Sequence, residues 1–168
     1  IGMSKEVLVD AMRYGSMASE DKREEHDLGR FGLGLKSASL SQCKILTVIS
    51  YHEGRVAAYS WDYDYILQKK DWIAKELLKG EILQLPYINE LKAQGKGTLV
   101  LWQDFDILHK SSEGLVFDAL NDMKVKLDDA IGLIFHRFLS SSKKKISFYI
   151  NNHKVRPRDP FLESHPKT

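Results

Sequence analysis

The most informative segment of this 168-residue chain is Gly29-Arg30-Phe31-Gly32-Leu33-Gly34-Leu35-Lys36-Ser37. Three glycines within six residues let the main chain bend tightly and leave room for a ligand to approach it. The run that follows, from Leu35 to Leu40, contains no helix-breaking residue and favours a helix. Free N–H groups at the start of a helix, beside a lysine, suit an anion, so the stretch predicts a phosphate-binding loop.

Two common glycine motifs do not fit this stretch. A P-loop places lysine directly after its last glycine and follows a buried strand. Here Leu35 separates Gly34 from Lys36, and the residues upstream are charged. The dinucleotide-binding fingerprint, Gly-x-Gly-x-x-Gly, has the reverse of the spacing found here. A glycine-rich turn without a ligand remains the alternative for the stretch taken alone.

The composition is that of one soluble globular domain, with 43% hydrophobic and 29% charged residues. A net charge of +2 does not support a nucleic-acid or membrane surface as partner. The single cysteine, Cys43, excludes an internal disulfide and leaves secretion without support. Since no apolar run approaches the roughly 20 residues of a membrane span and no signal peptide is visible, we expect a cytoplasmic protein, or a nuclear one in a eukaryote.

The first half of the chain predicts a helix, a polar segment and a hairpin. Ser4 suits the cap of a short helix that ends before Gly15. The charged residues that follow are typical of an exposed loop, and their position between Gly15 and Gly29 also fits a mobile lid, for which we take residues 16–34. Apolar residues at 44–50 and alternation at 55–63 then predict two strands joined at Glu53-Gly54.

The second half predicts a mixture of helices and strands. We expect helices at 65–79 and 113–139, and strands at 81–85, 98–102 and 145–150, with a turn at Asn151-Asn152. This order favours an α+β fold: a two-layer sandwich of a mixed, mainly antiparallel sheet with helices on one face, forming a single domain over residues 1–168.

The order of motifs resembles the GHKL ATPase superfamily, which includes gyrase, the mismatch-repair MutL proteins, histidine kinases, the large heat-shock chaperone ATPase and the MORC proteins. The second motif of that superfamily usually reads Asp-x-Gly-x-Gly-Met. Gly2 and Met3 match its last two positions, and the earlier positions would precede Ile1, so the first elements of the Bergerat-type ATP-binding fold are expected to be missing. Gly29, Gly32 and Gly34 match the third motif.

The continuation Gly34-Leu35-Lys36-Ser37-Ala38-Ser39 is most similar to the MORC-type branch and its bacterial relatives. The tail from Asn151 to Phe161 is similar to the end of this domain in bacterial members, so the resemblance covers nearly the whole chain.

The resemblance implies ATP, bound with Mg²⁺ under a lid and hydrolysed by water. Thr98, which follows Gly97 at a strand start, would lie near the adenine, although a β-branched residue is equally ordinary there. Lys36 would reach the terminal phosphate, the alternative being a solvated lysine on a first helical turn. The cofactor-binding residues implied are Gly2, Met3, Gly29, Arg30, Phe31, Gly32, Leu33, Gly34, Leu35, Lys36 and Thr98.

The resemblance also implies a water-activating glutamate and an Mg²⁺-binding asparagine on a helix that would precede Ile1. We therefore expect no catalytic and no metal-binding residue within this chain, and we predict that the chain alone is not a competent ATPase although its parent protein is. In the parent, ATP would drive lid closure and a conformational switch or homodimer formation. Two alternatives are a scaffold of the same fold that binds nucleotide or proteins without hydrolysis, and an unrelated α+β protein.

Overall fold

The computed structural model describes residues 2–13, 33–105, 113–141 and 146–162. Its contacts divide the chain into two units, Ile1–His109 and Lys110–Thr168, and each unit is described by itself. The expectation of a single domain stays a prediction. Within the described ranges, no helix combines the length and the apolar character that crossing a membrane requires.

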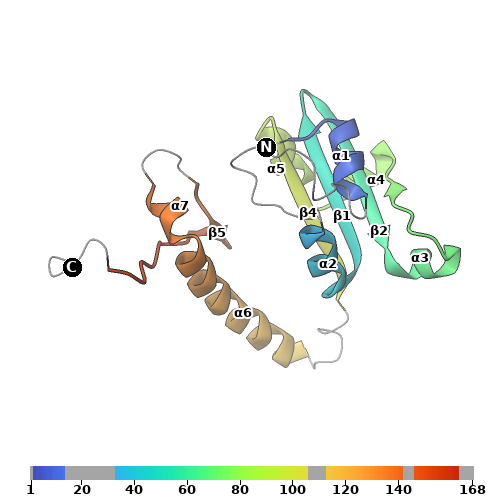
Figure 1. Cartoon of the computed structure of the whole chain (residues 1–168). Coiled ribbons are helices and arrows are strands. Elements are labelled where there is room, and N and C mark those ends of the chain that lie inside the picture. The colour runs from blue at the N-terminus through green and yellow to red at the C-terminus, as the bar shows by residue number, and fades with distance from the viewer. Residues whose placement is uncertain (1, 14–32, 106–112, 142–145, 163–168) are drawn as a thin grey trace, which may run out of the picture. The chain divides into compact units, whose positions relative to one another are not determined.

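A four-stranded antiparallel sheet organises the first unit (Figure 1). Its strands are β1 (Cys43–His52), β2 (Arg55–Asp62), β3 (Lys75–Glu76) and β4 (Gly97–Phe105), in the order β3-β2-β1-β4. The turn between β1 and β2 is confirmed at Glu53-Gly54, where both residues have positive φ, the conformation that tight hairpins need. The predicted strands at 44–50, 55–63 and 98–102 are likewise confirmed within one or two residues at most ends, β4 running longer.

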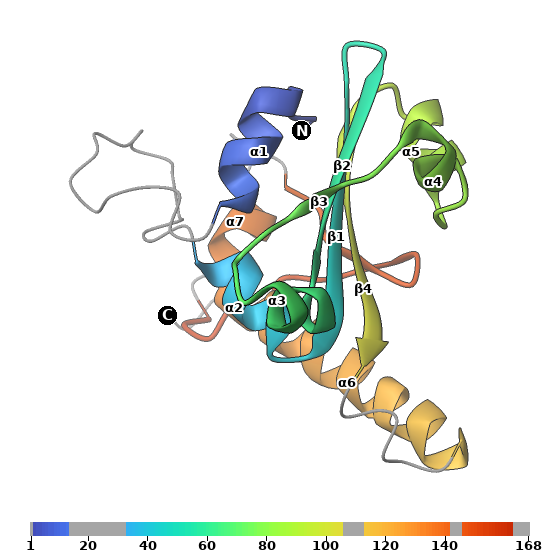
Figure 2. The same ribbon diagram turned by 90° about the vertical axis from the view of Figure 1, so that its right-hand side faces the viewer.

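Helices α1 (Lys5–Met12) and α2 (Gly34–Leu40) lie against one face of this sheet (Figure 2). α1 begins at its cap Ser4, whose hydroxyl accepts the N–H of Val7, as expected. The largest core cluster forms beneath α1 and consists of Leu8, Met12, Leu46, Val48, Tyr59, Trp61 and Ile66. The α+β fold with an antiparallel sheet and helices is therefore confirmed.

Two short helices, α4 (Lys79–Leu83) and α5 (Ile88–Ala93), cover the opposite face of the sheet (Figure 2). Ile82, Ile88 and Leu91 pack there against Ile49 of β1 and Ala58 of β2. The sheet is thus covered by helices on both faces, which adds a layer to the predicted arrangement.

The prediction for residues 65–85 was wrong in its boundaries and in one element type. The helix at 65–79 is the short α3 (Tyr63–Lys69), which ends because Lys70 takes a left-handed φ of 53°. The strand expected at 81–85 is the helix α4, whose Glu81 side chain accepts the N–H of Leu78 and so completes the first turn.

The second unit contains α6 (Glu113–Ile134), α7 (His136–Ser140) and the two-residue strands β5 (Tyr149–Ile150) and β6 (His153–Lys154). The single helix predicted at 113–139 is interrupted at Phe135, whose backbone leaves the helical region. The strand predicted at 145–150 is shorter than expected, since only its last two residues pair, with β6 across the turn at Asn151-Asn152.

Candidate functional site

Met3, two residues before α1, is bound to the central strand β1 by a pair of hydrogen bonds. The Met3 N–H donates to Ser50 Oγ at 2.6 Å, and the Ser50 hydroxyl donates to the Met3 carbonyl at 2.9 Å. Ser50 is 1% exposed, so water does not compete for these bonds. One serine of β1 therefore fixes where α1 begins.

Gly2 lies so close to two strands that only glycine fits. A Cβ atom built on Gly2 would lie 2.0 Å from the carbonyl oxygen of Tyr51 and 3.2 Å from the Gly97 nitrogen. Because both neighbours are main-chain atoms, a side chain cannot be accommodated by rotation. Gly2 therefore brings the start of the chain into contact with β1 and with the beginning of β4.

Thr98 joins this group through the register of the sheet. Thr98 is the Cα partner of Ser50 in the β1–β4 pairing, and directly opposite residues share a face. That face is the one that carries α1 and α2. The structure thus brings together Gly2, Met3 and Thr98, three of the residues expected at a binding site from widely separated motifs.

An exposed strip continues from Thr98 along β4. Thr98, Val100 and Trp102 alternate on the α1–α2 face, and all three are exposed, with Val100 at 39% and Trp102 at 41%. At the far end of this β4 strip, the Trp102 indole Nε1–H donates to Ser39 Oγ of α2 at 2.8 Å. The β4 strip therefore runs from the Gly2–Met3 group to α2.

The start of α2 presents main chain rather than side chains. The helix begins at Gly34, and its cap residue Leu33 provides no side-chain hydrogen bond to the N–H groups. A Cβ atom on Gly34 would meet no heavy atom within 4 Å among the residues described, so packing does not explain this glycine. Gly29, Arg30, Phe31 and Gly32, the rest of the predicted loop, and residues 16–32 of the predicted lid lie outside the described residues.

Lys36 is buried against the end of α1, so the alternative of a solvated lysine was wrong. Its side chain is 2% exposed, and its Nζ donates to the carbonyl oxygens of Ala11 at 2.9 Å and Arg13 at 2.5 Å. Burial lowers the pKa of Lys36. These carbonyls belong to the last turn of α1, where a cation is favourable. Contact between Lys36 and a phosphate stays a prediction.

Two features of this site were not evident in the sequence. Ser50 belongs to no motif. Its role depends on the register between β1 and β4, which pairs it with Thr98, and on its hydrogen bonds with Met3. The β4 strip had one signal, the alternation of Thr98, Val100 and Trp102 with Leu99 and Leu101, but the sequence does not tell which face is covered. Among the residues described, no group of three or more His, Cys, Asp or Glu side chains is placed to hold a metal ion.

The comparison with protein families agrees with this arrangement. The model of the histidine kinase-, DNA gyrase B- and HSP90-like ATPase family matches residues 1–98, more than half of the chain. The chain belongs to this family, and its domain is an ATP-binding domain of the GHKL type. No curated protein and no solved structure matches the chain. The finer similarity to the MORC-type branch stays a prediction.

Proposed function

We propose that this chain is the part of a GHKL-type ATPase that holds ATP between the Gly2–Met3 group, the β4 strip and the start of α2. The observation that carries the proposal is the meeting of Gly2, Met3 and Thr98 where α1 begins beside β4, in a chain whose family binds ATP. Thr98 and Met3 would contact the adenine base, and the N–H groups of residues 32–35 would donate hydrogen bonds to the phosphates.

The spacing of these groups supports the proposal. Met3 precedes α1, and Lys36 binds the carbonyls at the other end of the same helix. An eight-residue helix is about 12 Å long at 1.5 Å per residue, which suits a ligand with its base at one end and its phosphates at the other. The uncapped start of α2 adds free N–H donors at the phosphate end.

The finer parts of the function rest on the family resemblance. Mg²⁺ would accompany the phosphates and neutralise their charge. Binding and hydrolysis would close residues 16–34 over the nucleotide and drive a conformational or dimerisation switch in the parent protein. The 168-residue chain by itself is proposed to bind nucleotide without releasing phosphate from it.

Gly34 and Gly80 provide a matched pair of variants for the test. Both glycines lie near the start of a short helix, and a Cβ on either meets no heavy atom within 4 Å. Gly34→Ala should therefore leave stability intact while its methyl group obstructs the phosphates. We expect calorimetric titration with Mg²⁺ and a non-hydrolysable ATP analogue to give at least about tenfold weaker binding for Gly34→Ala, and unchanged binding for Gly80→Ala.

Thr98 tests the other end of the site. Thr98→Val keeps the shape of the side chain and removes the hydroxyl, whereas Thr98→Ser keeps the hydroxyl. Loss of one hydrogen bond should weaken binding about threefold to tenfold in the valine variant alone. Equal affinity of Gly34→Ala, Thr98→Val and the unmodified chain would contradict the proposed placement of ATP.

A further inference from the structure

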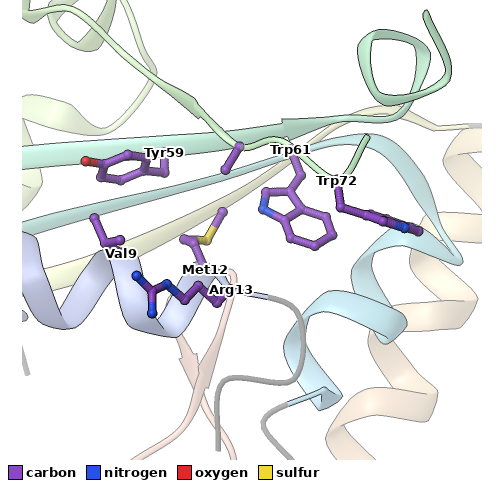
Figure 3. Close-up of a pocket in the computed structure, with 7 residues that line it drawn as sticks. Val9, Met12, Arg13, Tyr59, Trp61 and Trp72 are labelled. Atoms are coloured by element: carbon purple, nitrogen blue, oxygen red, sulfur yellow. The ribbon is translucent and has the colours of Figure 1, made fainter. Parts of the chain in front are cut away.

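A cavity lies on the other side of α1 from the β4 strip. Its volume is about 440 Å³, within the range of small-molecule pockets. α1 lies along one side of the cavity and β2 along another, and Trp72 lies beside Trp61 at one end (Figure 3). Ala74 also lines the cavity. Because the strand order is β3-β2-β1-β4, β2 is separated from β4 by β1, and none of the described lining residues is among those expected to bind ATP.

Three aromatic residues, Tyr59, Trp61 and Trp72, line this cavity. The rings of Trp61 and Trp72 are 5.2 Å apart between centroids and inclined by 42°, and Figure 3 shows them side by side at one end, with Tyr59 at the other. Trp61 is buried, whereas Trp72 is 55% exposed. The Tyr59 hydroxyl already donates to Glu76 at 3.1 Å, so Tyr59 offers the cavity its ring. Such walls favour a flat aromatic ligand.

Among the described residues that line the cavity, the side-chain charge is positive. Arg13 is the only charged residue among those described as lining it, the others being Val9, Met12, Tyr59, Trp61, Trp72 and Ala74. Its guanidinium lies 3.5 Å from Asp10, but both side chains are about two-thirds exposed, and an exposed pair of this kind contributes little. A guanidinium in this position is suited to a carboxylate or a similar anion.

We propose that this cavity binds a planar aromatic molecule of one or two rings that carries a negatively charged group. The ring system packs against Trp61, Trp72 and Tyr59, and the anionic group pairs with Arg13. The test needs no ATP, because the proposed ligand is a molecule other than the nucleotide.

The indole N–H signals of the three tryptophans provide the measurement. The chain is titrated with 1-naphthoate and followed by ¹H–¹⁵N correlation spectroscopy. Trp61 and Trp72 line the cavity, whereas the Trp102 indole is bonded to Ser39 away from it and serves as the internal reference. We expect saturable shifts of the Trp61 and Trp72 signals and no shift of the Trp102 signal.

Two variants separate the aromatic contact from the charge. Trp72→Ala should weaken naphthoate binding about tenfold, since one ring contact is worth about one factor of ten. Arg13→Gln should weaken naphthoate and leave the neutral 1-naphthalenemethanol unaffected, with Arg55→Gln, an exposed arginine at the start of β2, as the matched control.

Each outcome of these titrations either supports or overturns the proposal. Saturable shifts confined to Trp61 and Trp72 that weaken in both variants support the site. The proposal is overturned by the absence of saturable shifts, by equal shifts of all three indoles, which would mean non-specific binding only, or by unchanged affinity in Trp72→Ala. Equal loss of the charged and neutral probes in Arg13→Gln would overturn the assigned role of Arg13.

Discussion

Ser50 is the residue on which the position of α1 most depends, because its hydroxyl both accepts from and donates to Met3. Ser50→Ala would leave the N–H and the carbonyl of Met3 without these partners in a buried place. We expect the free energy of unfolding to fall by about 1–3 kcal/mol, measured by urea denaturation. The control is Ser41→Ala, which removes an exposed hydroxyl at the end of α2. Equal stability of the two variants would contradict the role given to Ser50.

Lys36 is the second residue whose environment defines its role. Lys36→Met keeps the length of the buried stem and removes the ammonium group from the Ala11 and Arg13 carbonyls. The expected cost is about 1–3 kcal/mol, and the amides of the last turn of α1 should exchange faster with solvent. Lys79→Met, at an exposed position in α4, should change stability by less than about 0.5 kcal/mol. Unchanged exchange in α1 after Lys36→Met would refute this role.

At the scale of elements, Asp62 connects α3 to β3. Its carboxylate accepts the N–H of Tyr65 at 3.1 Å as the cap of α3, and the Lys75 Nζ at 2.8 Å. The hydrogen bond from Lys75, helped by the Tyr65 N–H, holds the pKa of Asp62 below its ordinary value of 3.8. A carboxylate with a lowered pKa stabilises the fold above that ordinary value, and this stabilisation disappears as the pH falls through the lowered pKa.

Asp62 variants should separate the cap from the ion pair. We expect Asp62→Ala to lower the free energy of unfolding by about 1–2 kcal/mol at neutral pH, and Asp62→Asn to lose less because it still caps α3. The difference in the free energy of unfolding between the native chain and Asp62→Ala should shrink as the pH drops below 3.8. A difference that stays constant across that range would show that the carboxylate charge contributes nothing.

The elements also show how far the sequence predicts this fold. The hairpin of β1 and β2 was predictable because its apolar alternation and its Glu53-Gly54 turn are local signals. α4 was mistaken for a strand because its short apolar pattern fits either type, and the choice is made by Ile82 packing under the sheet. In the candidate site, motifs indicate Gly2 and Thr98, whose part in binding ATP stays a prediction. Ser50 belongs to no motif, and its contact with Met3, 47 residues away in the chain, depends on the tertiary structure.

At the scale of the whole molecule, the second unit has a close main-chain contact between α6 and residues 156–158. A Cβ on Gly132 of α6 would lie 2.7 Å from the Arg156 carbonyl oxygen, and the Gly132 carbonyl accepts the Arg158 N–H at 2.9 Å. The Arg158 guanidinium also pairs with Asp128 and Asp129 on α6. Residues 156–158 are therefore held along the helix by main-chain contact.

Gly132→Ala should detach this tail. We expect faster amide exchange at Arg158, while the amides of β1, which belong to the other unit, keep their exchange rates. Gly80→Ala, where a methyl group meets open space, should be neutral or stabilising by up to about 1 kcal/mol. Protection at Arg158 that survives in Gly132→Ala would show that the contact does not hold the tail.

The hydrogen bond from the Lys36 Nζ to the Arg13 carbonyl has a consequence for how the length of the chain between them can evolve. Because Arg13 and Lys36 are joined directly, the two ends of the intervening stretch are fixed by residues outside it. Under such a constraint, doubling the number of intervening residues adds only about 0.6 kcal/mol of closure entropy. The hydrogen bond between Lys36 and Arg13 is therefore compatible with differences in the length of chain that joins them.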